Sequence, residues 1–241
     1  NINKSNIVAN SLGICIGDLG FYLANDIILK NYQHNANSCK ILEYYNKIII
    51  NTIKGEIIDV KLPYDLQYEK VKECKESDIM EIYYLKTAWY TTIGPFCLGC
   101  MLADNNKIEI KKYEEIFKNL GVAFQIKDDI IGIYGDSNYI GKSTTSDISE
   151  FKQTILYSYV YNNEKKHLKY LNKYYGKSNV SESDIEIIKK IFIESGALEY
   201  ARKKMDNLFD ESISQIKQLN NLGKYQNIIL GLINYLRIRQ K

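Results

Sequence analysis

The sequence has few residues that interrupt helices. Only two of its 241 residues are proline, Pro63 and Pro95, and the Asn-Gly or Asp-Gly turns that mark β-hairpins do not occur. Apolar residues instead return every three or four positions, as Ile185, Ile188 and Phe192 illustrate. We therefore predict an all-α fold. The expected helices lie near residues 5–30, 39–55, 76–103, 109–134, 149–162, 164–175, 181–210 and 224–239, with a bend at Pro95.

The chain also lacks an excess of charge of one sign. The 32 Lys and Arg residues against 29 Asp and Glu leave a formal charge of +3, too small for a nucleic-acid-binding surface. No basic leader precedes an apolar core, and Asp, Lys or Asn interrupts each apolar run before the roughly 20 residues of a membrane span. We expect one domain over residues 1–241, a cytoplasmic location, no transmembrane segment and no nucleic-acid partner.

Cysteine and histidine are too scarce for a disulfide scaffold or a zinc site. The five cysteines are an odd number in a chain of this length, so we expect reduced thiols. Cys97-Leu-Gly-Cys100 is a single CxxC pair, and the chain has only two histidines. The four ligands of a structural zinc site are not available. We expect the two cysteines to pack as small apolar side chains.

The stretch from Gln125 to Gly132 carries the most informative pattern. At 3.6 residues per turn, Gln125, Asp128 and Asp129 share one helix face with Gly132, so the two carboxylates are expected to point into one place. Paired carboxylates are hard oxygen ligands suited to Mg²⁺, which also takes phosphate oxygens. The alternative is a solvated helix end, but residues 124–133 are too apolar for a surface helix. The pattern predicts a magnesium site.

Two lysines follow this stretch. Lys142 and Lys152 flank Asp147, and we expect their ammonium groups to hold a diphosphate opposite the metal. The run from Gly135 to Gly141-Lys142-Ser143 is similar to a P-loop, but five residues separate its glycines where the P-loop has four. The lysines therefore favour a diphosphate held by side chains over a nucleotide-binding loop.

This region resembles the second aspartate-rich region of the trans-isoprenyl diphosphate synthase family. The matching residues are Phe124 to Asp136, Gly141-Lys142, Asp147 and Lys152-Gln-Thr154.

Other segments resemble further motifs of the same family, in the family's order. They are Lys86-Thr87-Ala88 with Tyr90-Thr91 and Pro95, which is similar to the Lys-Thr motif, together with Gly17-Asp18, Gly55-Glu56-Ile-Ile-Asp59 and the basic end Arg239-Gln-Lys241. The matches span almost the whole chain.

The resemblance implies a helical bundle around a central cavity, usually a homodimer, that condenses an allylic diphosphate with isopentenyl diphosphate on Mg²⁺. It implies Asp128 as the direct metal ligand, with Asp129 and Asp147 supporting it or its waters. Tyr90 and Phe124 are candidates to line a dry pocket for the allylic cation. The residues implied to contact the allylic diphosphate or the developing cation are Lys86, Thr87, Gln125, Lys142 and Lys152.

Two features depart from the family pattern. Gly132 stands where many members have a third aspartate, and the first Asp-Asp-x-x-Asp motif and the Gly-Lys-Arg segment before it are absent from the sequence. We interpret the second departure as a missing N-terminal part and expect the isolated 241-residue chain to be inactive. Two alternatives stay open: a catalytically silent synthase-like subunit that binds a partner or regulates product length, and a purely structural bundle.

Overall fold

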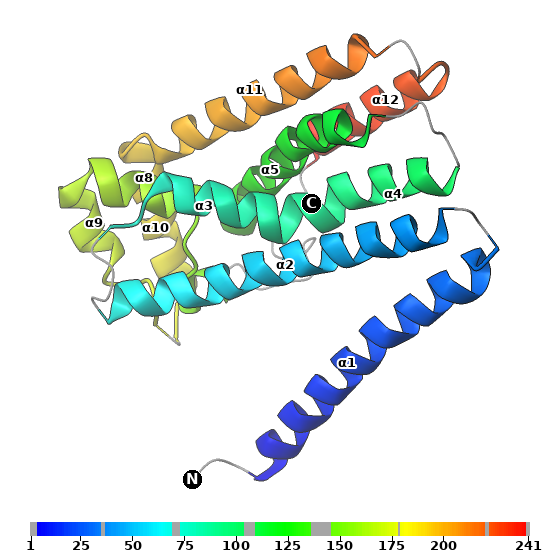
Figure 1. The fold of residues 1–241 in the computed structure, drawn as a ribbon. Coiled ribbons are helices and arrows are strands. Elements are labelled where there is room, and N and C mark those ends of the chain that lie inside the picture. Colours follow the sequence, from blue (N-terminus) through cyan, green and yellow to red (C-terminus); the bar gives the residue numbers. More distant parts are fainter. Residues whose placement is uncertain are drawn as a thin grey trace. The chain divides into compact units, whose positions relative to one another are not determined.

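The computed structural model describes residues 4–34, 37–68, 73–103, 109–135, 146–177, 179–219 and 222–239, and every regular element among them is a helix (Figure 1). The prediction of an all-α fold is confirmed. The elements are α1 (Lys4–Tyr32), α2 (Ser38–Gln67), α3 (Glu76–Ile82), the π-helix η1 (Tyr83–Ile93), α4 (Gly94–Leu102), α5 (Ile110–Tyr134), α7 (Ser146–Ser149), α8 (Ile155–Asn163), α9 (Lys165–Leu171), α10 (Glu182–Glu194), α11 (Ala197–Lys217) and α12 (Tyr225–Ile238).

Internal contacts divide the chain into two compact units. The first comprises Asn1–Lys47 and Leu98–Ile108, and the second comprises Ile48–Cys97 and Glu109–Lys241. Every described residue of the predicted site belongs to the second unit. The expectations of one domain and of a central cavity stay predictions.

Helix α1, in the first unit, is more apolar than the sequence analysis expected. Residues Asn6–Tyr32 are long and apolar enough to cross a membrane, with a mean hydropathy of 1.5, although Asp18 and Asp26 interrupt them. No other helix in the described ranges has these properties. A core helix of a water-soluble protein and a signal sequence can have the same properties, so this helix alone is weak evidence of a membrane span.

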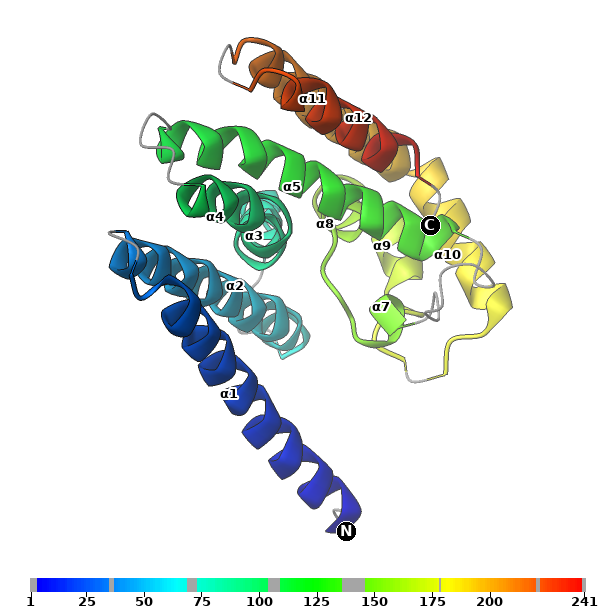
Figure 2. The ribbon, with the colours of Figure 1, turned by 90° about the vertical axis from the view of Figure 1, so that its right-hand side faces the viewer.

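Helix α5 is central to the second unit. It packs along both η1 and α11, and α12 contacts α5 and α11. Helix α5 therefore lies between η1 and the α11–α12 pair (Figures 1 and 2). The largest buried side chains include Trp89 and Tyr83 of η1, Tyr113 of α5 and Phe209 of α11. Polar side chains that α5 carries into these contacts are therefore removed from water.

The segment that carries the Lys-Thr pair is a π-helix. We predicted one bent α-helix over residues 76–103, but the chain changes from α to π geometry at Tyr83 and back to α geometry at Gly94. The amide of Gly94 donates to the carbonyl of Trp89, five residues back. Pro95 is the second residue of α4, directly after the π-helix, and it has no amide proton to donate to the preceding turn. Such π-helical segments are rare and frequently occur at functional sites.

Two predicted helices are each divided in the structure. The helix expected over residues 149–162 is α7 and α8, separated by residues 150–154, and the one expected over residues 181–210 is α10 and α11. Phe151 (φ 55°) lies in the first break and Gly196 (φ 79°) in the second. A residue in this left-handed region cannot continue a right-handed helix. Helix α2, in contrast, continues to Gln67, beyond its predicted end at residue 55.

The backbone of helix α5 lies in close contact with the backbone of η1 at Gly121. A Cβ atom added to Gly121 would lie only 2.4 Å from the Cα of Ala88. A side chain of any size at position 121 would therefore push the two helices apart.

We predict that Gly121→Ala lowers the free energy of unfolding by about 1–3 kcal/mol, because this overlap outweighs a gain of roughly 1 kcal/mol in helix propensity. Gly231→Ala on α12 is the matched control, since nothing lies within 4 Å of its added Cβ, and it should raise stability by about 0.5–1 kcal/mol. Urea unfolding followed by circular dichroism measures both variants. Equal changes in the two would contradict the close approach.

Candidate active site

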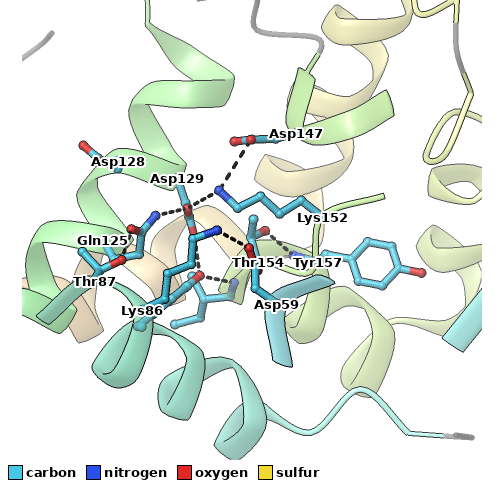
Figure 3. A network of polar contacts seen from close by, with 12 residues as sticks. Asp59, Lys86, Thr87, Gln125, Asp128, Asp129, Asp147, Lys152, Thr154 and Tyr157 are labelled. Atoms are coloured by element: carbon cyan, nitrogen blue, oxygen red, sulfur yellow. Dashed lines mark hydrogen bonds and ion pairs between the residues drawn. The ribbon is translucent and has the colours of Figure 1, made fainter. Parts of the chain in front are cut away.

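The predicted site residues come from four parts of the second unit and lie near one another (Figure 3). Lys86 and Thr87 are on η1, and Asp147 is on α7. Helix α5 contributes Gln125, Asp128 and Asp129, and Lys152 lies in the turn before α8. Lys142 falls outside the described residues.

The carboxylate of Asp129 is the most enclosed group of the site, at 1% exposure. Gln125 Nε2 donates to its Oδ1 at 2.8 Å, and the hydroxyl of Tyr83 donates a short hydrogen bond to its Oδ2. Lys152 Nζ lies 4.0 Å from Oδ1. Both oxygens therefore have protein partners, as a buried carboxylate requires.

Burial raises the pKa of Asp129 to about 6, although the charge of Lys152 and the hydrogen bonds from Tyr83 and Gln125 act in the opposite direction. Burial and the Asp129 charge also raise the pKa of Tyr83 well above its usual value, so this hydroxyl stays protonated as a donor. Burial lowers the pKa of Lys152, but the charges of Asp129 and Asp147 outweigh it and the pKa rises. Lys152 is therefore a permanent cation in the site.

Thr87, the second residue of the Lys-Thr pair, is connected to Asp129 through Gln125. The hydroxyl of Thr87 donates to Gln125 Oε1 at 2.6 Å, and the amide nitrogen of the same Gln125 donates to Asp129. Thr87 is 2% exposed. The predicted residues Thr87, Gln125 and Asp129 thus form one continuous chain of hydrogen bonds.

Lys86 is held by two acids of α2. Its Nζ lies 2.5 Å from Asp59 Oδ2 and 2.8 Å from Glu56 Oε2. Burial lowers the pKa of Lys86, but these two hydrogen bonds outweigh it and the pKa rises. A Cβ added to Gly55 would lie 2.2 Å from the Lys86 amide nitrogen, so glycine lets α2 approach η1 closely enough for both contacts.

Lys152 reaches the site from a strained turn. Its amide donates to the carbonyl of Asp147 at 2.9 Å, and its Nζ lies 3.5 Å from Asp147 Oδ1. Phe151, just before it, has a φ of 55° and packs edge-on against the rings of Tyr157 and Tyr175. These ring contacts offset a backbone cost of about 1–2 kcal/mol.

The structure separates the two adjacent aspartates that we expected to converge. Asp129 is buried, whereas the side chain of Asp128 is 40% exposed and accepts a short hydrogen bond from Arg239 (Figure 3 labels both aspartates). Consecutive residues of a helix point about 100° apart, so one can face the core while the next faces outward. The guanidinium of Arg239 also lies 4.2 Å from the ring centroid of Phe124.

Asp147 lies against the position where a third aspartate of α5 would stand. A Cβ added to Gly132 would lie 3.2 Å from Asp147 Oδ2. The carboxylate of Asp147 therefore occupies the space beside Gly132 that a longer side chain would need. A carboxylate is thus present at this face of α5 although the sequence has Gly132.

The donor set fits Mg²⁺. In the described part of the chain no group of three or more His, Cys, Asp or Glu side chains is arranged to hold a metal ion. Mg²⁺ does not require one, because it commonly takes one or two carboxylates together with waters and phosphate oxygens. The carboxylates Glu56, Asp59, Asp129 and Asp147 outnumber the paired ammonium groups of Lys86 and Lys152 by four to two. Asp128 on α5 and Asp147 beside Gly132 are two partly exposed carboxylates that could hold the ion.

The role of the two aromatic candidates at the allylic cation stays a prediction. Tyr90 is 54% exposed, and the guanidinium of Arg239 lies over the ring of Phe124. The CxxC residues form no disulfide, with Cys97 buried and Cys100 partly buried. Burial raises the pKa of Cys100, which makes its thiol less reactive.

The sequence analysis missed the role of Tyr83 in holding Asp129 and that of Glu56 and Asp59 in holding Lys86. The segment from Gly55 to Asp59 was identified only as similar to a family motif, and no contact was predicted for its residues. The glycine at position 55, one residue before an acid, was the available signal. Tyr83 is one of 21 tyrosines, and nothing in its local sequence distinguishes it.

We predict that Asp129→Asn makes the metal-free protein more stable at neutral pH. The folded pKa of about 6 exceeds the ordinary value of 3.8, so the stabilisation from protonating Asp129 is complete below about pH 4 and is lost as the pH rises through 6. Asparagine resembles the protonated acid at every pH. In EDTA, the difference in unfolding free energy between variant and wild type should grow by roughly 1–2 kcal/mol from pH 5 to pH 8. A difference that does not change with pH would contradict this account.

Known proteins similar to this chain include prenyl transferases and diphosphate synthases. Residues 3–192 match the polyprenyl synthetase family model. A prenyl transferase from Cyanidium caldarium is 27% identical over 230 residues, which are 95% of this chain and 65% of that protein. A geranylgeranyl diphosphate synthase from Saccharolobus solfataricus is 32% identical over 188 residues, which are 75% of this chain and 55% of that protein. The chain therefore spans less than two thirds of the length of these relatives.

Solved structures have the same fold. The geranylgeranyl pyrophosphate synthase from Corynebacterium glutamicum, complexed with isoprenyl diphosphate and magnesium, aligns with a TM-score of 0.82 at 22% identity over 95% of this chain and 63% of that one. The T. brucei farnesyl diphosphate synthase aligns with a TM-score of 0.82 at 18% identity over 96% of this chain and 82% of that one. With the family model matching most of its residues, the chain belongs to the polyprenyl synthetase family.

Proposed function

We propose that the full-length protein is a prenyltransferase that condenses an allylic diphosphate with isopentenyl diphosphate and releases inorganic diphosphate. Membership of the polyprenyl synthetase family supports this function. The observation that carries it is that the site holds two ammonium groups, Lys86 and Lys152, each beside its own pair of carboxylates (Figure 3). Both substrates are highly charged and water-soluble, so we place the reaction in the cytoplasm.

In the proposed reaction the carbon–oxygen bond of the allylic diphosphate breaks, and its electron pair leaves with the diphosphate. The double bond of isopentenyl diphosphate then forms the new carbon–carbon bond, and loss of a proton restores a double bond. Lys86 and Lys152 bind the departing oxygens, where negative charge develops. The Thr87–Gln125 hydrogen bond fixes two neutral dipoles beside the reacting carbon. Asp128 and Asp147 would hold Mg²⁺, which would supply neutralisation of the diphosphate charge and polarisation of the bond that breaks.

The silent-subunit alternative gains no support from the site. A subunit without chemistry has no need to keep a lysine beside a buried carboxylate that costs stability, yet Lys152 lies beside Asp129 here, and Lys86 is held by Asp59. The relatives named above are described as prenyl transferase or synthase.

The proposal is tested by incubating the full-length protein with Mg²⁺, isopentenyl diphosphate and allylic primers of several lengths, and identifying the products by mass spectrometry. We expect a prenyl diphosphate longer than the primer. If no primer is elongated, the proposed function is wrong.

Asp128→Ala should lower turnover by about 100-fold or more with unchanged helical content, because a partly exposed metal ligand is lost. Asp206→Ala is the matched control: Asp206 also pairs with an arginine of the C-terminal region and is 43% exposed, against 40% for Asp128. We expect the control to keep its turnover. Similar losses in both variants would show that Asp128 acts only through its arginine pairing.

We also propose that the protein is a homodimer that pairs through α2. Its exposed apolar residues follow the 3,4 spacing of a coiled-coil seam: Ile50, Ile53, Ile57, Val60 and Tyr64. A second copy can present the same stripe about a twofold axis, so one surface serves both subunits. The stripe therefore supports a symmetric pair.

Val60→Glu places a charge at this seam and should raise the dimer dissociation constant of the full-length protein at least 10-fold. Lys190→Glu also introduces a glutamate at an exposed position, but on α10, which carries none of the stripe residues, and it should leave the constant within about threefold. Light scattering with size-exclusion chromatography measures both. A monomeric wild-type protein, or equal effects of the two substitutions, would contradict pairing through α2.

A further inference from the structure

The hydroxyl of Tyr83 joins three elements of the second unit. Tyr83 is the first residue of η1 and is 2% exposed. Its hydroxyl donates to Asp129 Oδ2 on α5 and accepts from the backbone amide of Ile155, the first residue of α8, at 2.8 Å. One hydroxyl thus uses its donor and one acceptor position within the protein. Removing the oxygen alone would leave two buried polar groups without this partner.

The contact with Ile155 places the start of α8. The first amides of a helix have no partner within the helix, and Thr154 satisfies another of them by accepting from Tyr157. With Tyr83 bound to Ile155, the first turn of α8 is fixed to η1. Lys152 lies three residues before Ile155, so its backbone path is constrained at this end by Tyr83. At the other end it is constrained by the hydrogen bond that the Lys152 amide donates to the carbonyl of Asp147.

The contact with Asp129 orients the other half of the site. With Tyr83 on Oδ2, Asp129 presents Oδ1 to Gln125 at 2.8 Å and to Lys152 at 4.0 Å. Gln125 in turn accepts from Thr87. A rotation of the carboxylate would release both neighbours at once. Asp129 is therefore a fixed acceptor within the protein, and Tyr83 is the group that fixes it.

We infer that Tyr83 is a positioning residue of this active site: its hydroxyl holds Asp129 and the start of α8 so that Lys152 and the Thr87–Gln125 pair are in place before the substrate and Mg²⁺ bind. The inference rests on the proposed function. Tyr83 touches neither substrate nor metal in this account. It acts through Asp129 and through Ile155.

The test compares Tyr83→Phe with Tyr157→Phe in the full-length protein. Tyr157 is also buried, and its hydroxyl donates to Asn172 at 2.9 Å instead of to a site residue. Two measurements are made: Mg²⁺-dependent binding of inorganic pyrophosphate by calorimetry, and steady-state kinetics with an allylic primer. Tyr83→Phe should weaken pyrophosphate binding and lower kcat, each by about 10- to 100-fold. Losses of this size are typical when a residue that hydrogen-bonds to a ligating residue is replaced. Tyr157→Phe should leave both within about threefold of wild type.

A double substitution separates positioning from a general loss of stability. If Tyr83 acts mainly through Asp129, Tyr83→Phe should weaken pyrophosphate binding less than threefold in the Asp129→Asn background. This comparison also serves if Tyr83→Phe alone does not fold, because the double variant has no buried carboxylate left without its donor. Equal losses in both backgrounds, or equal losses in Tyr83→Phe and Tyr157→Phe, would overturn the inference.

The outcome for the function is read separately. A wild-type protein that elongates primers while Tyr83→Phe binds and turns over normally overturns the inference alone. A wild-type protein that elongates no primer overturns the proposed function, and the pyrophosphate measurements still decide the role of Tyr83. Absence of Mg²⁺-dependent pyrophosphate binding in the wild type overturns the inference as well.

Discussion

The carboxylate of Asp129 is 1% exposed, so it needs hydrogen-bond donors or cations from the protein in place of water. The other residues of the site are arranged to supply them. Tyr83 of η1, Gln125 of α5 and Lys152 from the turn before α8 supply them. Since these groups come from separate parts of the chain, Asp129 finds all its partners only when the second unit is folded. The cost of burying the carboxylate is thus coupled to the assembly of the site, and the protein retains an acid whose pKa burial raises to about 6.

Close backbone contacts keep η1 in a fixed position beside this acid. Gly55 lets α2 reach the backbone of Lys86, and Gly121 lets α5 reach that of Ala88. The π-helix that carries Lys86 and Thr87 is therefore held by two helices at residues only two positions apart, Lys86 and Ala88. Side chains fixed in this way suit a reaction that depends on cations already in place when negative charge develops. Each lysine already has carboxylate partners, so a diphosphate with its metal would enter a site whose charges are organised in advance.

The sequence predicted the helical class and α5, and it singled out several residues that the structure brings together around Asp129, because apolar periodicity and the resemblance are local properties of the chain. It did not predict how Asp128 and Asp129 divide between surface and core, because that depends on which neighbours cover α5. The turn before α8 was also missed, since Phe151 takes a left-handed conformation that only its packing against Tyr157 and Tyr175 maintains. The pairing of Lys86 with Asp59 joins residues 27 positions apart. Local patterns do not report such contacts.

The most direct test of this account is a crystal structure of the full-length protein with Mn²⁺ in place of Mg²⁺ and a non-hydrolysable allylic diphosphate. We predict that anomalous scattering locates manganese at Asp128, with Arg239 displaced, and that the diphosphate contacts Lys86 and Lys152. Asp129 should keep its hydrogen bonds from Tyr83 and Gln125. Manganese bound directly by Asp129 with Tyr83 displaced, or a diphosphate that contacts neither lysine, would contradict the account.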